Sequence, residues 1–227
     1  MRKFPYFCGK ETDTMKILKV PFVENPEETD LDSLVETRGA RFLIDTVNWP
    51  DKFPYAPIAG GSILRTPDSF IVDFRVSGLD LRVQNLEDNG SQWEDSCVEM
   101  FVQSPSGTDY FNFEINPLGK ILSAAGPDRH QRVKRSLEEL SEIIRIHSVT
   151  SNKPINYEGG IHSWRVTLCI PLELLGIDPE NVPCEIRANF YKCGDLTAHP
   201  HFVTWSPVET PNPDFHRPEF FGKLILK

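Results

Sequence analysis

Two stretches that alternate apolar and polar residues lie on either side of a short turn between residues 97 and 116, and they constrain the fold more than any other part of the sequence. A period of two indicates a β-strand with one buried face. The segment SPSGTD between the stretches is rich in the residues that turns require. The apolar positions are Val98, Met100 and Val102 in the first stretch and Phe111, Phe113 and Ile115 in the second. The sequence therefore predicts a β-hairpin with one apolar face.

The opposite face of this hairpin is unusual because it carries two carboxylates and two amides. Glu99 lies on the first strand, Asn112, Glu114 and Asn116 lie on the second, and Trp93 precedes the first strand. Planar polar groups beside an aromatic ring are suited to a polar, neutral ligand. We therefore expect this face to contribute to a binding site.

Alternation recurs along the rest of the chain and predicts an all-β sandwich with at most short helical turns. The further strands that we expect cover residues 42–50, 70–78, 164–170, 185–191, 202–205 and 222–226. Residues 51–61 contain two prolines and two glycines, which predicts a loop. Ser136, followed three residues later by Glu139, is typical of a helix start.

The chain shows no internal repeat and no convincing linker, which favours a single domain. At 227 residues it is long enough for one sizeable core. We expect residues 1–40 to form an N-terminal extension packed on or near the domain, and residues 41–227 to form one β-sandwich.

Charge and hydropathy exclude some classes of partner. The formal net charge is −9, which disfavours nucleic acid because phosphate binding requires clustered Lys and Arg. No apolar run approaches the length of a membrane span. The basic start MRKFPYFCGK lacks the apolar segment of a secretory signal, so we expect either a cytoplasmic protein or one whose signal has been removed.

The cysteines and other possible metal ligands form no established motif. The odd number of cysteines and the absence of a CxxC motif favour reduced thiols, with redox or metal chemistry as the alternative. Cys193, His199 and His201 do not have the spacing of a zinc site. Asp88, Asn89 and Asp95 could together bind a structural calcium ion between loops, although no EF-hand pattern is present. The five cysteines are Cys8, Cys97, Cys169, Cys184 and Cys193.

Glu99 and Glu114 are candidates for catalysis because they lie on neighbouring strands and face the same way. Glycoside hydrolysis uses such a pair of carboxylates, one as acid and the other as nucleophile or base. The alternative is that both acids only accept hydrogen bonds or are balanced by Arg187. The nucleophile motif GxSxG, the zinc motif HExxH and the phosphate-binding P-loop are absent.

Two aromatic residues are expected in loops near this face. Trp93 precedes the hairpin, and Phe215 lies in the proline-rich segment TPNPDFHRPEFF. Each ring is either an anchor of the core or a platform for a ligand. Sugars stack their apolar CH faces on rings, and their hydroxyls bind carboxylates and amides.

In several segments the chain resembles the family-nine carbohydrate-binding modules, which are related to the DOMON-type β-sandwiches. The segments that carry the resemblance are WEDSCVEMFV, FNFEINPLG, IPLELLG, RANFYKCGD and TWSPVETPNPDFHRPEFFGKLIL. They span roughly residues 40–227. The resemblance implies a jelly-roll-like sandwich of two antiparallel sheets that binds sugar without catalysis, often in polysaccharide utilisation.

The resemblance also implies which residues bind the ligand. Trp93 and Phe215 correspond to two rings that clamp a terminal sugar, and Glu99 corresponds to the glutamate of the slot floor. Asn116 and Asn212 correspond to its amides. In the second hairpin strand, where the family has an arginine, this chain has Glu114.

The sequence leaves two other functions open. One is a glycoside hydrolase that uses Glu99 and Glu114. The other is a haem-binding DOMON-like domain, which requires axial ligands such as Met and His. The alternation directs Met100 towards the core, which disfavours haem.

Overall fold

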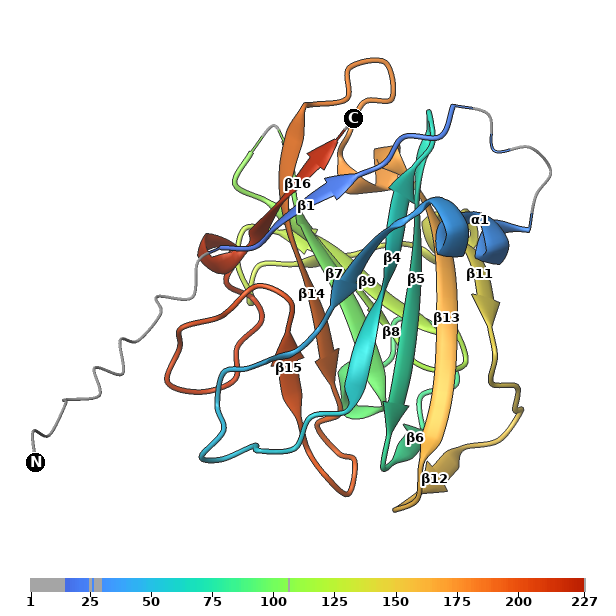
Figure 1. Ribbon diagram of the computed structural model, residues 1–227, viewed down its shortest axis with the longest axis vertical. Helices are drawn as coiled ribbons and strands as arrows, with labels where there is room; N and C mark the ends of the chain where they lie inside the picture. Colours follow the sequence, from blue (N-terminus) through green and yellow to red (C-terminus); the bar gives the residue numbers. More distant parts are fainter. Residues whose placement is uncertain (1–14, 25, 27–29, 106, 227) are drawn as a thin grey trace, which may run out of the picture.

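A computed structural model describes residues 15–24, 26, 30–105 and 107–226 of the chain. In the N-terminal extension, residues 1–14, which include Cys8, and residues 25 and 27–29 lie outside the described residues. The fold is the predicted all-β sandwich, with strand pairs that are antiparallel except for one, β1 with β16 (Figure 1). None of the described helices has the length and apolar character of a membrane span.

The larger sheet has nine strands. Its main path runs β1-β16-β14-β7-β8-β9-β10, and β15 joins β14 to β3 beside this path. Its strands are β1 (Ile17–Val20), β3 (Thr46–Val47), β7 (Cys97–Gln103), β8 (Tyr110–Ile115), β9 (Ile121–Gly126), β10 (Val133–Lys134), β14 (Glu185–Cys193), β15 (Phe202–Thr204) and β16 (Gly222–Leu226).

The second sheet has five strands in the order β11-β13-β5-β4-β2, and two further strands form a small ribbon. The five are β2 (Ala40–Leu43), β4 (Ile58–Arg65), β5 (Ser69–Gly78), β11 (Ile144–His147) and β13 (His162–Pro171). The ribbon pairs β6 (Leu81–Val83) with β12 (Ile155–Tyr157).

The helical elements are short. They are α1 (Leu31–Arg38), α2 (Leu137–Ser141), η1 (Gln92–Glu94), η2 (Leu172–Leu175) and η3 (Pro218–Phe220). Helix α2 begins at the expected capping box, in which Ser136 and Glu139 exchange hydrogen bonds. Helix α1 buries Leu34 and Val35 against the five-stranded sheet, and β1 pairs with β16, so both elements pack on the sandwich.

The main core fills the space between the two sheets, as the alternation predicts. Val98, Met100 and Phe113 from the nine-stranded sheet meet residues of the five-stranded sheet in one buried cluster. Phe42 and Phe190 join the two sheets through stacked rings with centroids 4.1 Å apart. Each fully buried side chain of this kind contributes about 1.5–3 kcal/mol relative to an exposed one.

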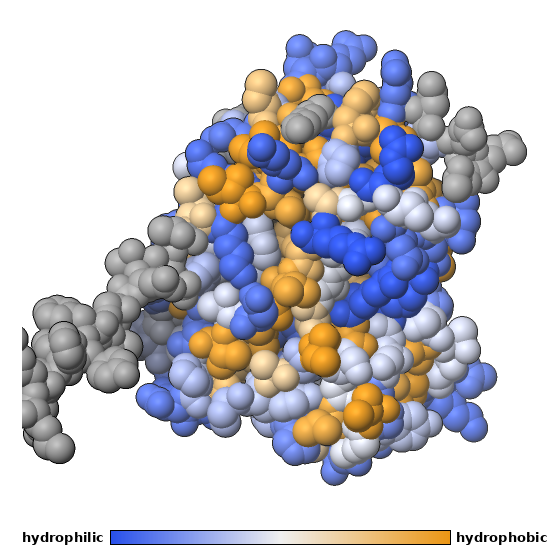
Figure 2. All heavy atoms as spheres, in the orientation of Figure 1, coloured by the Kyte–Doolittle hydropathy of each residue, from blue (hydrophilic) through white to orange (hydrophobic). Residues whose placement is uncertain are grey.

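The outer face of the nine-stranded sheet is also covered. The segment of residues 205–221 crosses it and encloses a second aromatic cluster. This cluster contains Trp49, Phe101, Tyr110, Tyr191 and Phe215 among others. The hairpin is therefore buried on both faces. On the side of the molecule in Figure 2, hydrophobic residues are dispersed among hydrophilic ones.

Two predicted boundaries are wrong. The single strand expected at residues 42–50 is divided between β2 and β3, which belong to different sheets. The loop expected at residues 51–61 ends early, because β4 begins at Ile58 and includes Gly60 and Gly61. At Gly61 a Cβ atom would lie 1.8 Å from the carbonyl oxygen of Asp73 on β5, so these glycines permit a close approach of strands rather than a turn.

We expect Gly61→Ala to lower the free energy of unfolding by about 1–3 kcal/mol, because the added methyl group must displace the backbone of β5. Chemical denaturation of the two proteins measures this difference. Gly107→Ala is the control, since the nearest atom to its added Cβ would be 3.9 Å away. Equal stability of the two variants would contradict the expectation.

Candidate functional site

A cleft of about 390 Å³ opens on the outer face of the nine-stranded sheet. Its floor comes from the four neighbouring strands β14, β7, β8 and β9. Its walls come from Trp93 in η1, from Asp195 and Phe202, and from the segments of residues 129–134 and 213–216. The residues of the floor are Glu99, Asn112, Glu114, Leu122, Ala124 and Cys193. The residues of the walls include Trp93, Arg129, Arg132, Asp195, Phe202, Asp214, Phe215 and His216.

Glu99 and Glu114 are directly opposite each other on β7 and β8 at the centre of the floor. They are 2% and 4% exposed. The Cys193 thiol donates to Glu99 Oε1 over 3.0 Å, and the Asn112 amide donates to Glu114 Oε1 over 2.7 Å. Glu114 Oε2 is buried and has no hydrogen-bond partner among the described residues. The floor thus offers an unpaired oxygen to a polar ligand.

Burial favours the neutral form of both floor carboxyls. It raises the pKa of Glu114 to about 7 and the pKa of Glu99 well above its ordinary value, with the neighbouring Glu114 charge adding to the shift at Glu99. Burial also raises the pKa of Asp195, in the wall, to about 6. A protonated carboxyl both donates and accepts hydrogen bonds, so this floor can bind hydroxyl groups in either sense.

A guanidinium group lies beside the floor, although it does not come from the hairpin. Arg132 Nη2 donates to Asn112 Oδ1 over 2.5 Å and to the carbonyl of Ala124 over 2.9 Å. Its guanidinium carbon is 4.2 Å from the centroid of the Tyr110 ring. The second hairpin strand has Glu114 at the position where the resemblance implies an arginine. The positive charge beside the floor comes instead from Arg132, in a neighbouring segment.

The two aromatic residues proposed from the sequence both line the cleft, but they differ in exposure. Trp93 lies in η1 and is 37% exposed, while its carbonyl accepts from the amide of Asp195 over 3.2 Å. Phe215 is 8% exposed and stacks on Tyr191 with centroids 4.2 Å apart. The Tyr191 hydroxyl also donates to the Phe215 carbonyl over 3.1 Å. Trp93 therefore presents a free ring, whereas Phe215 is largely packed.

The two proposed amides lie outside the cleft lining. Asn116 is fully buried just after β8, where its side chain donates to Asp95 Oδ2 and accepts from the amide of Lys120. Asn212 is exposed and accepts from Lys52 Nζ over 2.6 Å. The structure thus brings together Trp93, Glu99, Glu114 and Phe215 and leaves the two amides apart from them.

Several cleft residues were not proposed from the sequence. Asn112 shares the alternation that identified Glu114, so its position was available from the pattern. Arg132, Asp214 and His216 come from loops, and only the cationic run RHQRVK and the proline-rich segment marked them. The Tyr110 hydroxyl and His216 Nδ1 form a hydrogen bond of 2.8 Å in the wall.

The residues that the sequence suggested as possible metal ligands form hydrogen bonds or ion pairs with separate protein groups. Asp88 pairs with Arg145 over 2.7 Å, and Asp95 accepts from the amide of Gln84 over 2.8 Å. His199 pairs with Asp80 over 3.0 Å. His201 Nε2 lies 2.8 Å from Lys192 Nζ. Cys193 turns instead towards Glu99 on the floor of the cleft.

Comparisons with a family model and with solved structures found matches over nearly the whole chain. The family model of carbohydrate-binding family 9 matches residues 29–226. A solved structure from Bacteroides uniformis, described as that of a candidate carbohydrate-binding protein, is similar over 94% of this chain and 100% of its own, with 31% identity and a TM-score of 0.85. Among curated proteins, none matches the sequence significantly.

Two further similar structures are family-9 modules from Caldicellulosiruptor kristjanssonii. The one in complex with glucose has 13% identity and a TM-score of 0.56, over 93% of this chain and 96% of its own. The one in complex with cellotriose has 11% identity and a TM-score of 0.58, over 93% and 94%. At these identities they support the shared fold.

We expect His216 to make the protein less stable in acid. Burial, together with Arg132 and Arg129, lowers the pKa of His216 to about 3, against 6.5 ordinarily. Between pH 3 and pH 6.5 the His216 imidazole is protonated in the unfolded chain but not in the folded one. The free energy of unfolding therefore falls as pH falls. His216→Asn should reduce this slope by up to about 1.4 kcal/mol per pH unit.

Urea denaturation at a series of pH values between 3.5 and 6.5 measures the slope. Ile161→Asn, which changes an exposed side chain that binds no proton, is the control and should leave the slope as in the unmodified protein. The same slope in His216→Asn and the unmodified protein would contradict the expectation.

Proposed function

The chain belongs to carbohydrate-binding family 9, and we propose that it binds a saccharide, without hydrolysing it, in the cleft over β14, β7, β8 and β9. The observation that carries this proposal is the unpaired Oε2 of Glu114, buried in the floor of a cleft whose wall includes the exposed Trp93 ring. An unpaired polar atom beside a free ring suits a ligand with hydroxyls on its edge and CH groups on its face.

In this proposal Trp93 stacks on the sugar ring, and Glu99 and Glu114 bind its hydroxyls. Phe215 closes the opposite wall, where its stacking on Tyr191 keeps it rigid. A wall that is ordered before binding lowers the entropy cost of holding a ligand. Asn116 and Asn212 do not line the cleft, and their side chains bond to Asn85 and Lys52 instead.

The chemistry of the floor supports binding over hydrolysis. A retaining or inverting glycosidase needs one ionised and one protonated carboxyl, so its site drives the two pKa values apart. Here the pKa values of Glu99 and Glu114 are both raised, and for each the largest cause is the loss of water on burial. Loss of water therefore disfavours the ionised form at both positions, whereas one carboxyl of a glycosidase must be ionised to act as nucleophile or base.

We further propose that the protein serves polysaccharide utilisation by holding a saccharide for other proteins to process. Glucose and cellotriose are suitable first probes, because they occupy two modules of the same fold. Calorimetric titration of the full chain, preceded by a glycan array if neither probe binds, tests the proposal. No saccharide bound in either experiment would overturn it.

We expect Trp93→Ala to weaken saccharide affinity about ten-fold, because losing one stacking ring removes about 1–2 kcal/mol. Since the ring is 37% exposed, the melting temperature should change little. Tyr157→Ala, which removes an exposed ring outside the cleft, is the matched control for affinity. Trp93→Ala binding at full strength would exclude Trp93 from the site.

Phe215→Ala is expected to act through stability instead. Removing a buried, stacked phenylalanine costs about 3 kcal/mol or more in free energy of unfolding. Thermal melts beside the titrations separate this loss from a loss of binding.

We expect no hydrolysis of aryl glycosides of the sugars that bind. Turnover that disappears in both Glu99→Gln and Glu114→Gln would instead establish the hydrolase alternative. Turnover that survives both changes would point to a contaminating enzyme.

A further inference from the structure

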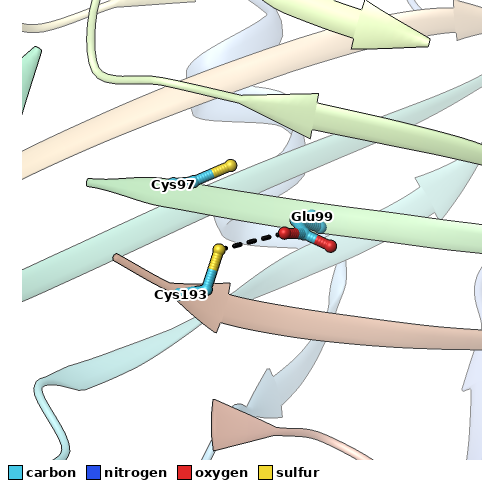
Figure 3. Close-up of side chains that lie close together, drawn as sticks. All are labelled: Cys97, Glu99 and Cys193. Atoms are coloured by element: carbon cyan, nitrogen blue, oxygen red, sulfur yellow. Dashed lines mark hydrogen bonds between the residues drawn. The ribbon is translucent and has the colours of Figure 1, made fainter. Parts of the chain in front are cut away.

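Two cysteines and a glutamate meet on the floor of the cleft (Figure 3). Cys97 and Cys193 are directly opposite each other on β7 and β14, and Glu99 is two residues along β7 and so faces the same side. The two Sγ atoms and a Glu99 carboxylate oxygen all lie within 4.8 Å of one another. This is the only such group of three or more possible metal ligands among the described residues.

This donor set suits a zinc-class ion. Zinc accepts thiolate and carboxylate ligands in a tetrahedral arrangement, with Zn–S near 2.3 Å. Two sulfurs in that arrangement are roughly 3.8 Å apart, and the ligand atoms of the cluster all lie within 4.8 Å of one another. Hard ions such as calcium and magnesium prefer oxygen ligands and do not fit a site with two sulfurs.

The surroundings of the cluster also favour a cation. Glu114 faces Glu99 from β8, and Asp195 follows Cys193 by two residues. A divalent ion would compensate the negative charge of carboxylates that lie so close together.

We propose that Cys97, Cys193 and Glu99 bind one zinc-class divalent ion at the floor of the cleft. Both thiols and the Glu99 carboxyl release their protons to solvent, and the ion with two thiolates and one carboxylate carries a net charge of −1. Glu99 and Cys193 line the cleft, whereas Cys97, directly opposite Cys193, is fully buried. The fourth coordination position therefore faces the cleft, where water or a ligand oxygen completes the tetrahedron.

The alternative is that the two cysteines act only as small apolar side chains. Both belong to the aromatic cluster around Phe101 and Tyr191. In that case the Cys193 thiol donates permanently to Glu99, as in Figure 3, and no ion displaces its proton. The two possibilities differ in a property that is measured without any saccharide.

The test is titration of the reduced, chelator-treated full chain with Co²⁺, followed in the near ultraviolet by thiolate-to-cobalt charge-transfer absorption. We expect a band that saturates at one ion per chain and is abolished when Zn²⁺ displaces the cobalt. Cys97→Ser and Cys193→Ser should each remove the band or weaken binding by about 100-fold or more, and Glu99→Gln should weaken it. Cys8→Ser, Cys169→Ser and Cys184→Ser are the controls and should keep it.

Thermal melts keep the result interpretable if a serine variant folds poorly. Zn²⁺ should raise the melting temperature of the unmodified protein and of Cys184→Ser, and should raise that of Glu99→Gln, which keeps both buried thiols, by less. Absence of the cobalt band in the reduced protein would overturn the proposal, as would a band that survives in both Cys97→Ser and Cys193→Ser. Because no saccharide is present, failure here leaves the proposed sugar binding untouched, and the converse also holds.

Discussion

The pairing of β7 with β8 at the centre of the nine-stranded sheet is the constraint on which the rest of the structure depends. One face of these strands supplies Val98, Met100 and Phe113 to the main core. The other face places Glu99 and Glu114 opposite each other on the floor of the cleft. Because the side-chain period is two, a shift of one residue in register would send the carboxyls into the core and the apolar residues into the cleft. The packing that stabilises the fold therefore also fixes the site.

Burying two neighbouring carboxyls is costly unless they are neutral or bonded. Here one oxygen of each accepts a hydrogen bond, from Cys193 or from Asn112, and the surroundings hold both pKa values high. Arg132 is held nearby on Asn112 rather than on either acid. This arrangement leaves hydrogen-bonding capacity on the floor, which a saccharide or an ion can use at different atoms of the same residues.

The walls of the cleft depend on segments far apart in the sequence. Trp93 is held by a backbone bond to Asp195, and Phe215 by stacking and a hydrogen bond to Tyr191. These contacts give the two rings different roles. The exposed indole is available to a ligand, whereas the phenyl ring joins the covering segment to the sheet and so stabilises the wall against which a ligand would lie.

The sequence alone determined the strands with clear alternation, the faces of the hairpin and the capping box at Ser136, because alternation and capping are local properties. It also identified Trp93, Glu99, Glu114 and Phe215, which share the cleft. Only the tertiary structure divided residues 42–50 between two sheets, placed Gly61 inside a strand, separated Asn116 and Asn212 from the cleft and brought Arg132 to it. It alone also set Cys193 beside Cys97. The reason is physical, since strand pairing and loop paths join residues distant in the chain, and no local pattern specifies which residues become neighbours.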